Sequence, residues 1–274
     1  MKNNKIGLHI RLVDYIHRVA LKAREMELKS FQTFTIFPCG RYLQLQQDDK
    51  QQFRAQRTHF DRLFLHGSYW INCASAYQKA DHLLEHEITM AQQLDFNFLV
   101  MHPGACHPLL DRTRAIELIA RRLNRALKKH RSVHIVLENV AHGKRAIGGS
   151  LEELAAIREL CSFPERVTFC IDTAHAHVYG YDVSSPQTQD QFIAHIVATL
   201  GAENITLIHL NDTKKALGSR LDQHAIPGRG AIGLPALKRF INNPLFAHCA
   251  VIVELPPLAQ SDEIAILKDI THET

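Results

Sequence analysis

Short apolar runs alternate with longer amphipathic segments along the whole chain. Eight runs rich in β-branched and aromatic residues lie at 5–10, 30–37, 62–66, 96–102, 133–138, 167–172, 205–210 and 250–255. Near-continuous apolar runs of this length are typical of parallel strands that are buried on both faces of their sheet. The pattern therefore predicts eight buried strands, each followed by a longer connecting segment.

Helical periodicity fills the connecting segments. Apolar side chains recur there at i, i+3, i+4 and i+7, and helices are expected at 76–94, 111–130, 234–241 and 262–270. Ser150 and, three positions later, Glu153 predict a capping box that begins a further helix. Eight strands, each followed by a helix, indicate an α/β protein with a (β/α)8 TIM barrel that forms one domain over residues 1–274. A doubly wound sheet is the alternative, because one miscounted strand separates the two folds.

The composition is that of a globular protein, with 46% hydrophobic and 22% charged residues. No apolar run approaches the roughly 20 residues that cross a bilayer, and the N-terminal segment lacks the apolar core of a secretory signal. The six cysteines include no C-x-x-C pair, which favours reduced thiols. We therefore expect a cytoplasmic protein that does not enter a membrane. The net charge of +4 permits an anionic partner, and the basic run at 121–131 is expected to be a charged exterior helix face.

Potential metal ligands stand at or just after the ends of six successive predicted strands: His66, His102, Glu138, Asp172, His209 and Glu254. One such residue at a strand end is more often an ordinary hydrogen-bonded loop residue. In a barrel, however, all these ends converge on the C-terminal face, where active sites lie. Six clustered acids and histidines would be destabilising there unless bound cations neutralised them. The set therefore predicts a metal centre.

Three further residues fit the same centre. His175 follows Asp172 by three positions, and Asp222 and His224 form a D-x-H pair in an extended segment. Five imidazoles with four carboxylates suit zinc better than magnesium, which prefers oxygen ligands. Nine side chains exceed the needs of two ions, so three Zn2+ with one bridging carboxylate are expected. Three such ions outweigh four carboxylates by about two charges, which suits a phosphodiester.

At these residues the chain resembles the endonuclease IV family of apurinic/apyrimidinic endonucleases, within the xylose isomerase-like TIM barrel superfamily. The matching segments are HGSYWIN (66–72), MHPGA (101–105), LENVA (137–141), CIDTAHAHVYGYD (170–182), IHLNDTKKALGSRLDQHAIPGRGAIG (208–233) and VIVEL (251–255). They occur in the family's order, and the CIDT and HLND segments are the most specific of them.

The resemblance implies a division of the ligands and a reaction. One zinc would be held by His66, His102 and Glu138, a second by Glu138, Asp172, His209 and Glu254, and a third by His175, Asp222 and His224. The catalytic carboxylates would be Glu138, Asp172 and Glu254, and Mn2+ could replace zinc at one site. The family cleaves double-stranded DNA on the 5′ side of an abasic site, leaving a 3′-hydroxyl and a 5′-deoxyribose phosphate. We expect the protein to act as a monomer.

DNA contacts are expected at Tyr69, which matches a position that helps to penetrate the duplex, and at the cations Arg41, Lys214, Arg220 and Arg229. The chain also departs from the family. The loop at 8–13 has no glycine, and 37–42 reads Phe-Pro-Cys-Gly-Arg-Tyr in place of a polar DNA-gripping loop. Gly67 stands where Asp is common, and Gln223 stands where Arg is common. The metal chemistry is therefore expected to be retained while the DNA grip is altered.

Two other functions remain open. A sugar isomerase or epimerase on the same barrel would use one or two ions, so counting the bound metals discriminates it. A DNA-binding relative without catalysis would keep the metals for stability, and a cleavage assay on an abasic duplex discriminates that alternative.

Overall fold

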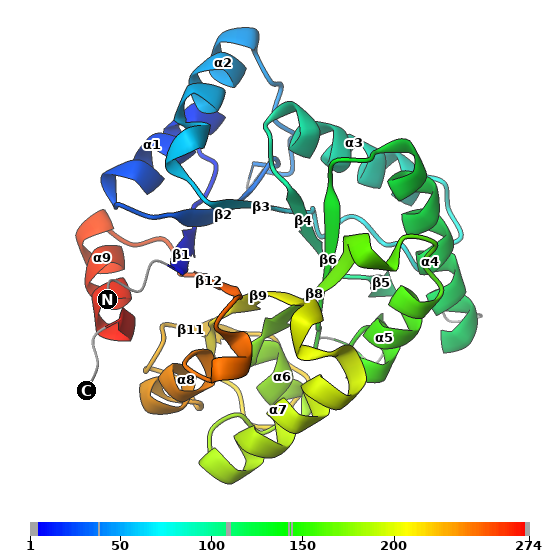
Figure 1. Ribbon diagram of the computed structural model, residues 1–274, viewed down its shortest axis with the longest axis vertical. Coiled ribbons are helices and arrows are strands. Elements are labelled where there is room, and N and C mark those ends of the chain that lie inside the picture. The colour runs from blue at the N-terminus through cyan, green and yellow to red at the C-terminus, as the bar shows by residue number, and fades with distance from the viewer. Residues whose placement is uncertain (1–4, 38, 108–110, 142, 144, 272–274) are drawn as a thin grey trace.

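The computed structural model describes residues 5–37, 39–107, 111–141, 143 and 145–271. Eight parallel strands close into a barrel, with β1 paired to both β2 and β12 (Figure 1). The barrel strands are β1 (Ile6–His9), β2 (Ser30–Phe34), β3 (Arg62–His66), β4 (Phe98–Met101), β6 (His134–Glu138), β8 (Val167–Asp172), β9 (Ile205–His209) and β12 (Ala250–Val253). The (β/α)8 TIM barrel is confirmed, and closure through β1 and β12 excludes the doubly wound sheet.

Helices surround the barrel (Figure 1). They are α1 (Ile16–Glu25), α2 (Gln47–Gln56), α3 (Lys79–Gln93), α4 (Arg112–Lys129), α5 (Leu151–Glu159), α6 (Thr173–Tyr179), α7 (Pro186–Leu200), α8 (Leu234–Ile241) and α9 (Gln260–Thr271). The loops contain two short antiparallel strand pairs: β5 (Gly104–Ala105) with β7 (Ala146–Ile147), and β10 (Asp212–Thr213) with β11 (His224–Ala225). The four helices with expected bounds are confirmed to within a few residues.

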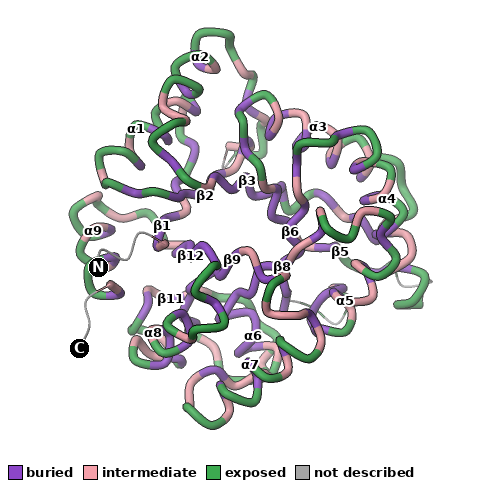
Figure 2. Tube along the Cα trace, viewed as in Figure 1, coloured by how far each residue is buried: buried purple, intermediate pink, exposed green. Residues whose placement is uncertain are grey.

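Most residues of the barrel strands are buried, as the purple centre of Figure 2 shows. Alternate strand positions form a separate apolar cluster, made of Phe64, Val100, Val136, Cys170, Leu207, Ala250 and Ile252. Because successive side chains of a strand point to opposite faces, one alternate set fills the barrel interior and the other packs against the helices. The interior is therefore a packed layer, and the next inward position on each strand faces the space above it.

Two local predictions around the loops need correction. Strand β2 ends at Phe34 and not at residue 37, and an isolated bridge joins Ile36 to Tyr42; Pro38 of this loop lies outside the described residues. The Ser150 side chain does accept the Glu153 N–H, but the Glu153 carboxylate accepts the N–H of Gly148 (2.9 Å) instead of closing a capping box.

The basic run of α4 is not uniformly exterior, which corrects a third prediction. Arg122 is buried, and its guanidinium donates to the carbonyls of Cys73, Ser75 and Tyr77. It therefore anchors the segment that leads into α3. Within the described part of the chain, none of the helices is long and apolar enough to span a membrane.

Candidate metal centre

The ligand-type side chains lie in one layer above the apolar interior because of strand periodicity. His66, Glu138 and Asp172 each stand two positions after an interior residue of the same strand, namely after Phe64, Val136 and Cys170. The same spacing holds for His102, His209 and Glu254 at the ends of β4, β9 and β12. Side chains two apart share a strand face, so all six point into the barrel mouth. The sequence prediction that these six converge agrees with the geometry.

Glu138 lies at the centre of the layer and is buried. Its Oε2 is 3.2 Å from His66 Nε2 and 3.3 Å from His102 Nε2. Its Oε1 is 3.1 Å from His209 Nδ1 and 3.2 Å from His175 Nδ1. One carboxylate thus faces four imidazoles from four different elements, which is the arrangement of a ligand shared between cations.

A second grouping joins the loops to the barrel. His175 lies on the short helix α6. The Asp222 carboxylate is 3.2 Å from His175 Nε2 and 3.3 Å from His224 Nε2, while Asp172 Oδ2 is 3.7 Å from His224 Nε2. The Asp172 side chain also caps α6 by accepting the His175 N–H (2.8 Å). The cap fixes the helix that carries His175.

Three groups of side chains can each offer ligand atoms within 4.8 Å of one another: His66 with His102 and Glu138, Glu138 with Asp172 and His209, and Asp172 with His175 and His224. The first group reproduces the trio implied by the family. The second lacks Glu254, and the third has Asp172 where the resemblance implies Asp222. Glu254 is nevertheless 3.9 Å from His209 and 3.7 Å from His224, and Asp222 touches both histidines of the third group.

Amide side chains that sequence analysis missed orient these groups. Gln32 donates to Glu254 (2.9 Å) and accepts from His209 Nε2 (2.8 Å). Asn211 donates to Asp172 (2.7 Å) and to Glu254 (3.0 Å). Such bonds fix the rotamer and tautomer of a ligand. Strand β2 also carries the polar residues Ser30 and Thr33, so no sequence signal singled out Gln32.

His9 ends β1 and also faces the layer, with its Nδ1 3.5 Å from Glu254. Burial lowers the pKa of His9 to about 4. It stands at the end of a barrel strand like the six predicted side chains, and its strand position was the signal that could have found it.

Asp212 is of a residue type that could bind a metal, but its carboxylate is taken up by hydrogen bonds to the backbone. Its buried carboxylate accepts backbone N–H groups of Thr213, Gly228, Gly230, Ile232 and Gly233 at 2.8–3.2 Å. A β-carbon on Gly230 would overlap that carboxylate. Asp212 therefore shapes the segment that carries Arg229.

Ionised carboxylates are favoured in the layer. Burial opposes ionisation of Glu138, but the positive charge of His209 and His102 outweighs it and holds the pKa of Glu138 well below its ordinary value. Burial likewise opposes protonation of His175, yet Asp172 and Asp222 raise the pKa of His175 well above its ordinary value. The layer thus demands positive charge, which protons or metal cations can supply.

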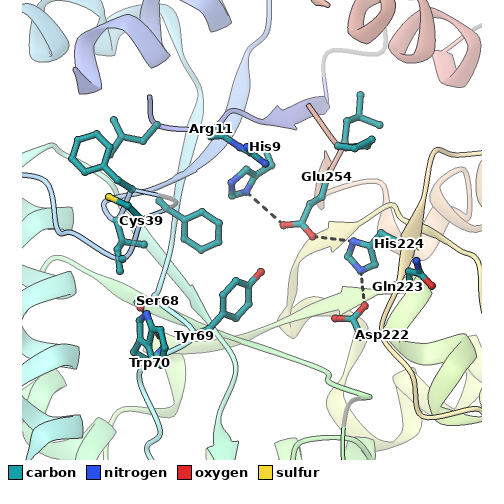
Figure 3. Close-up of a pocket in the computed structure, with 17 residues that line it drawn as sticks. His9, Arg11, Cys39, Ser68, Tyr69, Trp70, Asp222, Gln223, His224 and Glu254 are labelled. Atoms are coloured by element: carbon teal, nitrogen blue, oxygen red, sulfur yellow. Dashed lines mark hydrogen bonds and ion pairs between the residues drawn. The ribbon is translucent and has the colours of Figure 1, made fainter. Parts of the chain in front are cut away.

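A cavity of about 700 Å³ opens beside the layer (Figure 3). Along one wall His9, Glu254, His224 and Asp222 follow one another at 3.3–3.7 Å between their nearest polar atoms, and Tyr69 faces them. The Tyr69 ring lies 5.4 Å from the His66 ring and 5.3 Å from the His102 ring, yet 65% of the residue is exposed.

The four cations expected to contact DNA are not among the residues that line this cavity. Arg41 stacks over the Phe37 ring, while Lys214 and Arg229 are exposed. Arg220 lies 3.6 Å over the Tyr179 ring and lines a second cavity of about 390 Å³. Sequence analysis missed Arg11, an exposed cation that lines the larger cavity.

The chain is similar to other proteins along nearly its whole length. The family described as xylose isomerase-like TIM barrel matches residues 21–270. A relative named "Probable endonuclease 4", from Thermosipho melanesiensis, is 34% identical over 261 residues, covering 92% of each chain. The endonuclease IV structure from Thermus thermophilus superposes with a TM-score of 0.84 at 25% identity, covering 97% of this chain and 98% of that one.

Other enzymes share the barrel without sharing the sequence. A D-tagatose 3-epimerase-like protein superposes with a TM-score of 0.74 at 18% identity over 97% of this chain and 96% of its own. That likeness shows the fold alone, because one barrel supports many chemistries. The match at the family level is more specific, and the chain belongs to the endonuclease IV family of metal-dependent nucleases within the xylose isomerase-like TIM barrels.

Proposed function

We propose that the protein hydrolyses the phosphodiester on the 5′ side of an abasic site in double-stranded DNA, leaving a 3′-hydroxyl and a 5′-deoxyribose phosphate. We propose three Zn2+ as its cofactors, with Mn2+ acceptable at one site. Family membership and the layer of nine ligand-type side chains support this function. The observation that carries it is the central Glu138, which faces four imidazoles at 3.1–3.3 Å.

The donor set fits zinc. Imidazole nitrogens and carboxylate oxygens are its usual ligands, and both kinds present lone pairs that a shared cation would satisfy. His224 Nε2 is buried and has no hydrogen-bond partner within the described part of the chain, although Asp222 lies 3.3 Å away. Such an atom gains a partner when a metal binds.

The residues would hold the ions in three sets, with Glu138 bridging the first two: His66, His102 and Glu138; Glu138, Asp172, His209 and Glu254; His175, Asp222 and His224. Zinc bound there would supply a nucleophilic hydroxide at neutral pH and positive charge beside the phosphate oxygens. Gln32 and Asn211 keep Glu254 and Asp172 oriented through the hydrogen bonds they donate. Glu138, Asp172 and Glu254 act by holding charge in place, so no separate general base is required.

The chain's own surface would open and hold the DNA. Tyr69 stands exposed directly over two ligand histidines, so a ring that entered the duplex would bring the backbone to the layer. The cations Arg41, Lys214, Arg220 and Arg229, together with Arg11, would neutralise phosphates around the mouth.

Two measurements on the purified protein test the function. Elemental analysis should find about three zinc equivalents, and the protein should cut a duplex carrying one tetrahydrofuran abasic analogue on the 5′ side. Two ions or fewer without cleavage would favour the sugar isomerase or epimerase. Binding of the duplex without single-turnover cleavage would favour a DNA-binding relative. A monomer by light scattering would agree with the expected oligomeric state.

A further inference from the structure

A buried carboxylate of α3 lies beneath the two loops that border the larger cavity. Glu87 has no exposed surface. Its Oε2 accepts the Thr35 hydroxyl (2.6 Å), and its Oε1 accepts the Ser68 N–H (3.2 Å). Thr35 directly follows β2, and Ser68 lies two residues after β3. One side chain therefore joins two loops that are more than 30 positions apart.

Each of these contacts lies at the base of a wall of the cavity. Thr35 precedes Ile36 and Phe37, which line the cavity, and its carbonyl accepts the Leu43 N–H (2.8 Å) to close the loop. Ser68 precedes Tyr69 and Trp70, which also line the cavity and are 65% and 68% exposed. The Tyr69 ring lies near the rings of Phe34, His66 and His102, so its position depends both on those contacts and on the base of the loop that carries it and Trp70.

Packing alone does not account for a carboxylate at this place. Burial raises the pKa of Glu87 to about 7, and within the described residues no Lys, Arg or His forms an ion pair with it. By contrast, the buried Glu263 of α9 pairs with Lys22 at 2.6 Å. An unpaired buried carboxyl costs stability, so the contacts that can account for Glu87 are the two hydrogen bonds it accepts from the loops.

We propose that Glu87 is a positioning residue that holds the Tyr69–Trp70 pair against the loop at 35–43, so that the aromatic wall is formed before DNA arrives. It touches no metal ligand, and its loss should slow the opening of the duplex while leaving hydrolysis at the metal layer intact. This inference rests on the proposed function.

The test compares Glu87→Ala, Glu87→Gln and Thr35→Val, with Glu263→Gln as the matched control of a buried helix glutamate away from the cavity. Three readouts are needed: zinc content, hydrolysis of bis(p-nitrophenyl) phosphate, which requires no duplex opening, and single-turnover cleavage of the abasic duplex. Trp70 is the only tryptophan of the chain, so its fluorescence reports directly on this loop.

Glu87→Ala should slow abasic-duplex cleavage about 10- to 100-fold, because small misplacements of positioning groups have effects of that size. It should shift the Trp70 emission and leave zinc content and small-ester hydrolysis unchanged. Glu87→Gln should restore most of the rate, since the amide can still accept from Ser68 and donate to the Thr35 oxygen. Thr35→Val should show a smaller loss in the same direction, and Glu263→Gln none.

Unchanged duplex cleavage by Glu87→Ala would overturn the inference, and so would a parallel loss of zinc and small-ester hydrolysis. If Glu87→Ala does not fold, Thr35→Val decides, and wild-type cleavage by that variant counts against the inference. Failure of the unmodified protein to cut the abasic duplex would instead refute the proposed function, whatever the variants do.

Discussion

At the scale of single residues, the central position of Glu138 makes it the most sensitive side chain of the layer. Glu138→Gln keeps the shape but removes a negative charge that faces four imidazoles. We expect weaker zinc binding and a fall in turnover of about 100-fold or more. Zinc content and abasic-duplex kinetics measure both effects. Glu117→Gln, at an exposed pair with Arg114, is the control. Full activity with full zinc content would contradict the assignment of Glu138.

Glu87 makes a separate prediction about stability and pH. Its pKa is about 7 in the folded protein against 4.5 ordinarily, so the folded state binds more protons between these values. The stability that it contributes is present below about pH 4.5 and is lost as the pH rises through 7. The loss amounts to at most about 3 kcal/mol. Urea unfolding of the wild type should weaken between pH 5 and 8 relative to Glu87→Gln; parallel pH curves would contradict this.

The strand-end side chains could be predicted from the sequence, whereas their amide partners could not. His66 or Asp172 stands at a position that the strand period fixes, so its direction follows from the fold. Asn211 and Gln32 orient ligands through hydrogen bonds whose partners come from other strands. No spacing along the chain encodes those contacts. Asp212 is the opposite case. Its residue type suggests a metal ligand, but its carboxylate accepts hydrogen bonds from backbone N–H groups instead.

At the scale of elements, α6 and the β10–β11 pair form a unit attached to the barrel mouth. If Asp222 and His224 hold their own ion, changing both to Ala should remove about one zinc equivalent and leave two. Mass spectrometry under native conditions counts the ions. Asp172→Asn is the informative comparison, because Asp172 lies near His175, His209 and His224. Unchanged stoichiometry in the double variant would mean that these residues bind no metal.

The altered loop after β2 carries the fourth prediction. Arg41→Ala should weaken binding of the abasic duplex and reduce the log–log salt slope by about one, while single-turnover cleavage of bound DNA barely changes. Arg11→Ala, in the neighbouring loop after β1, is the paired variant, since Arg11 lines the cavity itself. Tyr69→Ala should instead slow cleavage. A salt slope that does not move in Arg41→Ala would show that this loop does not meet DNA.

Helices and strands could be predicted from the sequence where their pattern of apolar residues extends over enough positions to show a period. The barrel strands and α8 agree closely with the pattern, whereas the seven-residue α6 and the two-residue strands β10 and β11 are too short to show a period. Tertiary contacts and capping by Asp172 form α6. The end of β2 was misplaced because Ile36 and Phe37 continue the apolar run beyond the ladder.

At the scale of the whole molecule, metal binding should be coupled to stability. Clustered carboxylates and imidazoles in a buried layer stabilise the fold only when positive charge is present. Removal of zinc by EDTA should lower Tm by several degrees, because a ligand that binds only the folded state stabilises it by mass action. Scanning calorimetry with zinc added back is the control. An identical Tm after verified removal would contradict the coupling.

The closure of the barrel has a kinetic consequence. The first and last strands pair directly, Ile6 opposite Val251, and Glu254 directly follows the last strand, which also pairs with β9. Contacts between such distant segments form slowly, because the chain between them must first be ordered. The complete donor set therefore requires β12 to have joined the barrel, because Glu254 follows that strand. In a refolding experiment, the helical signal should rise before zinc is taken up, so that metal uptake marks the last step of folding.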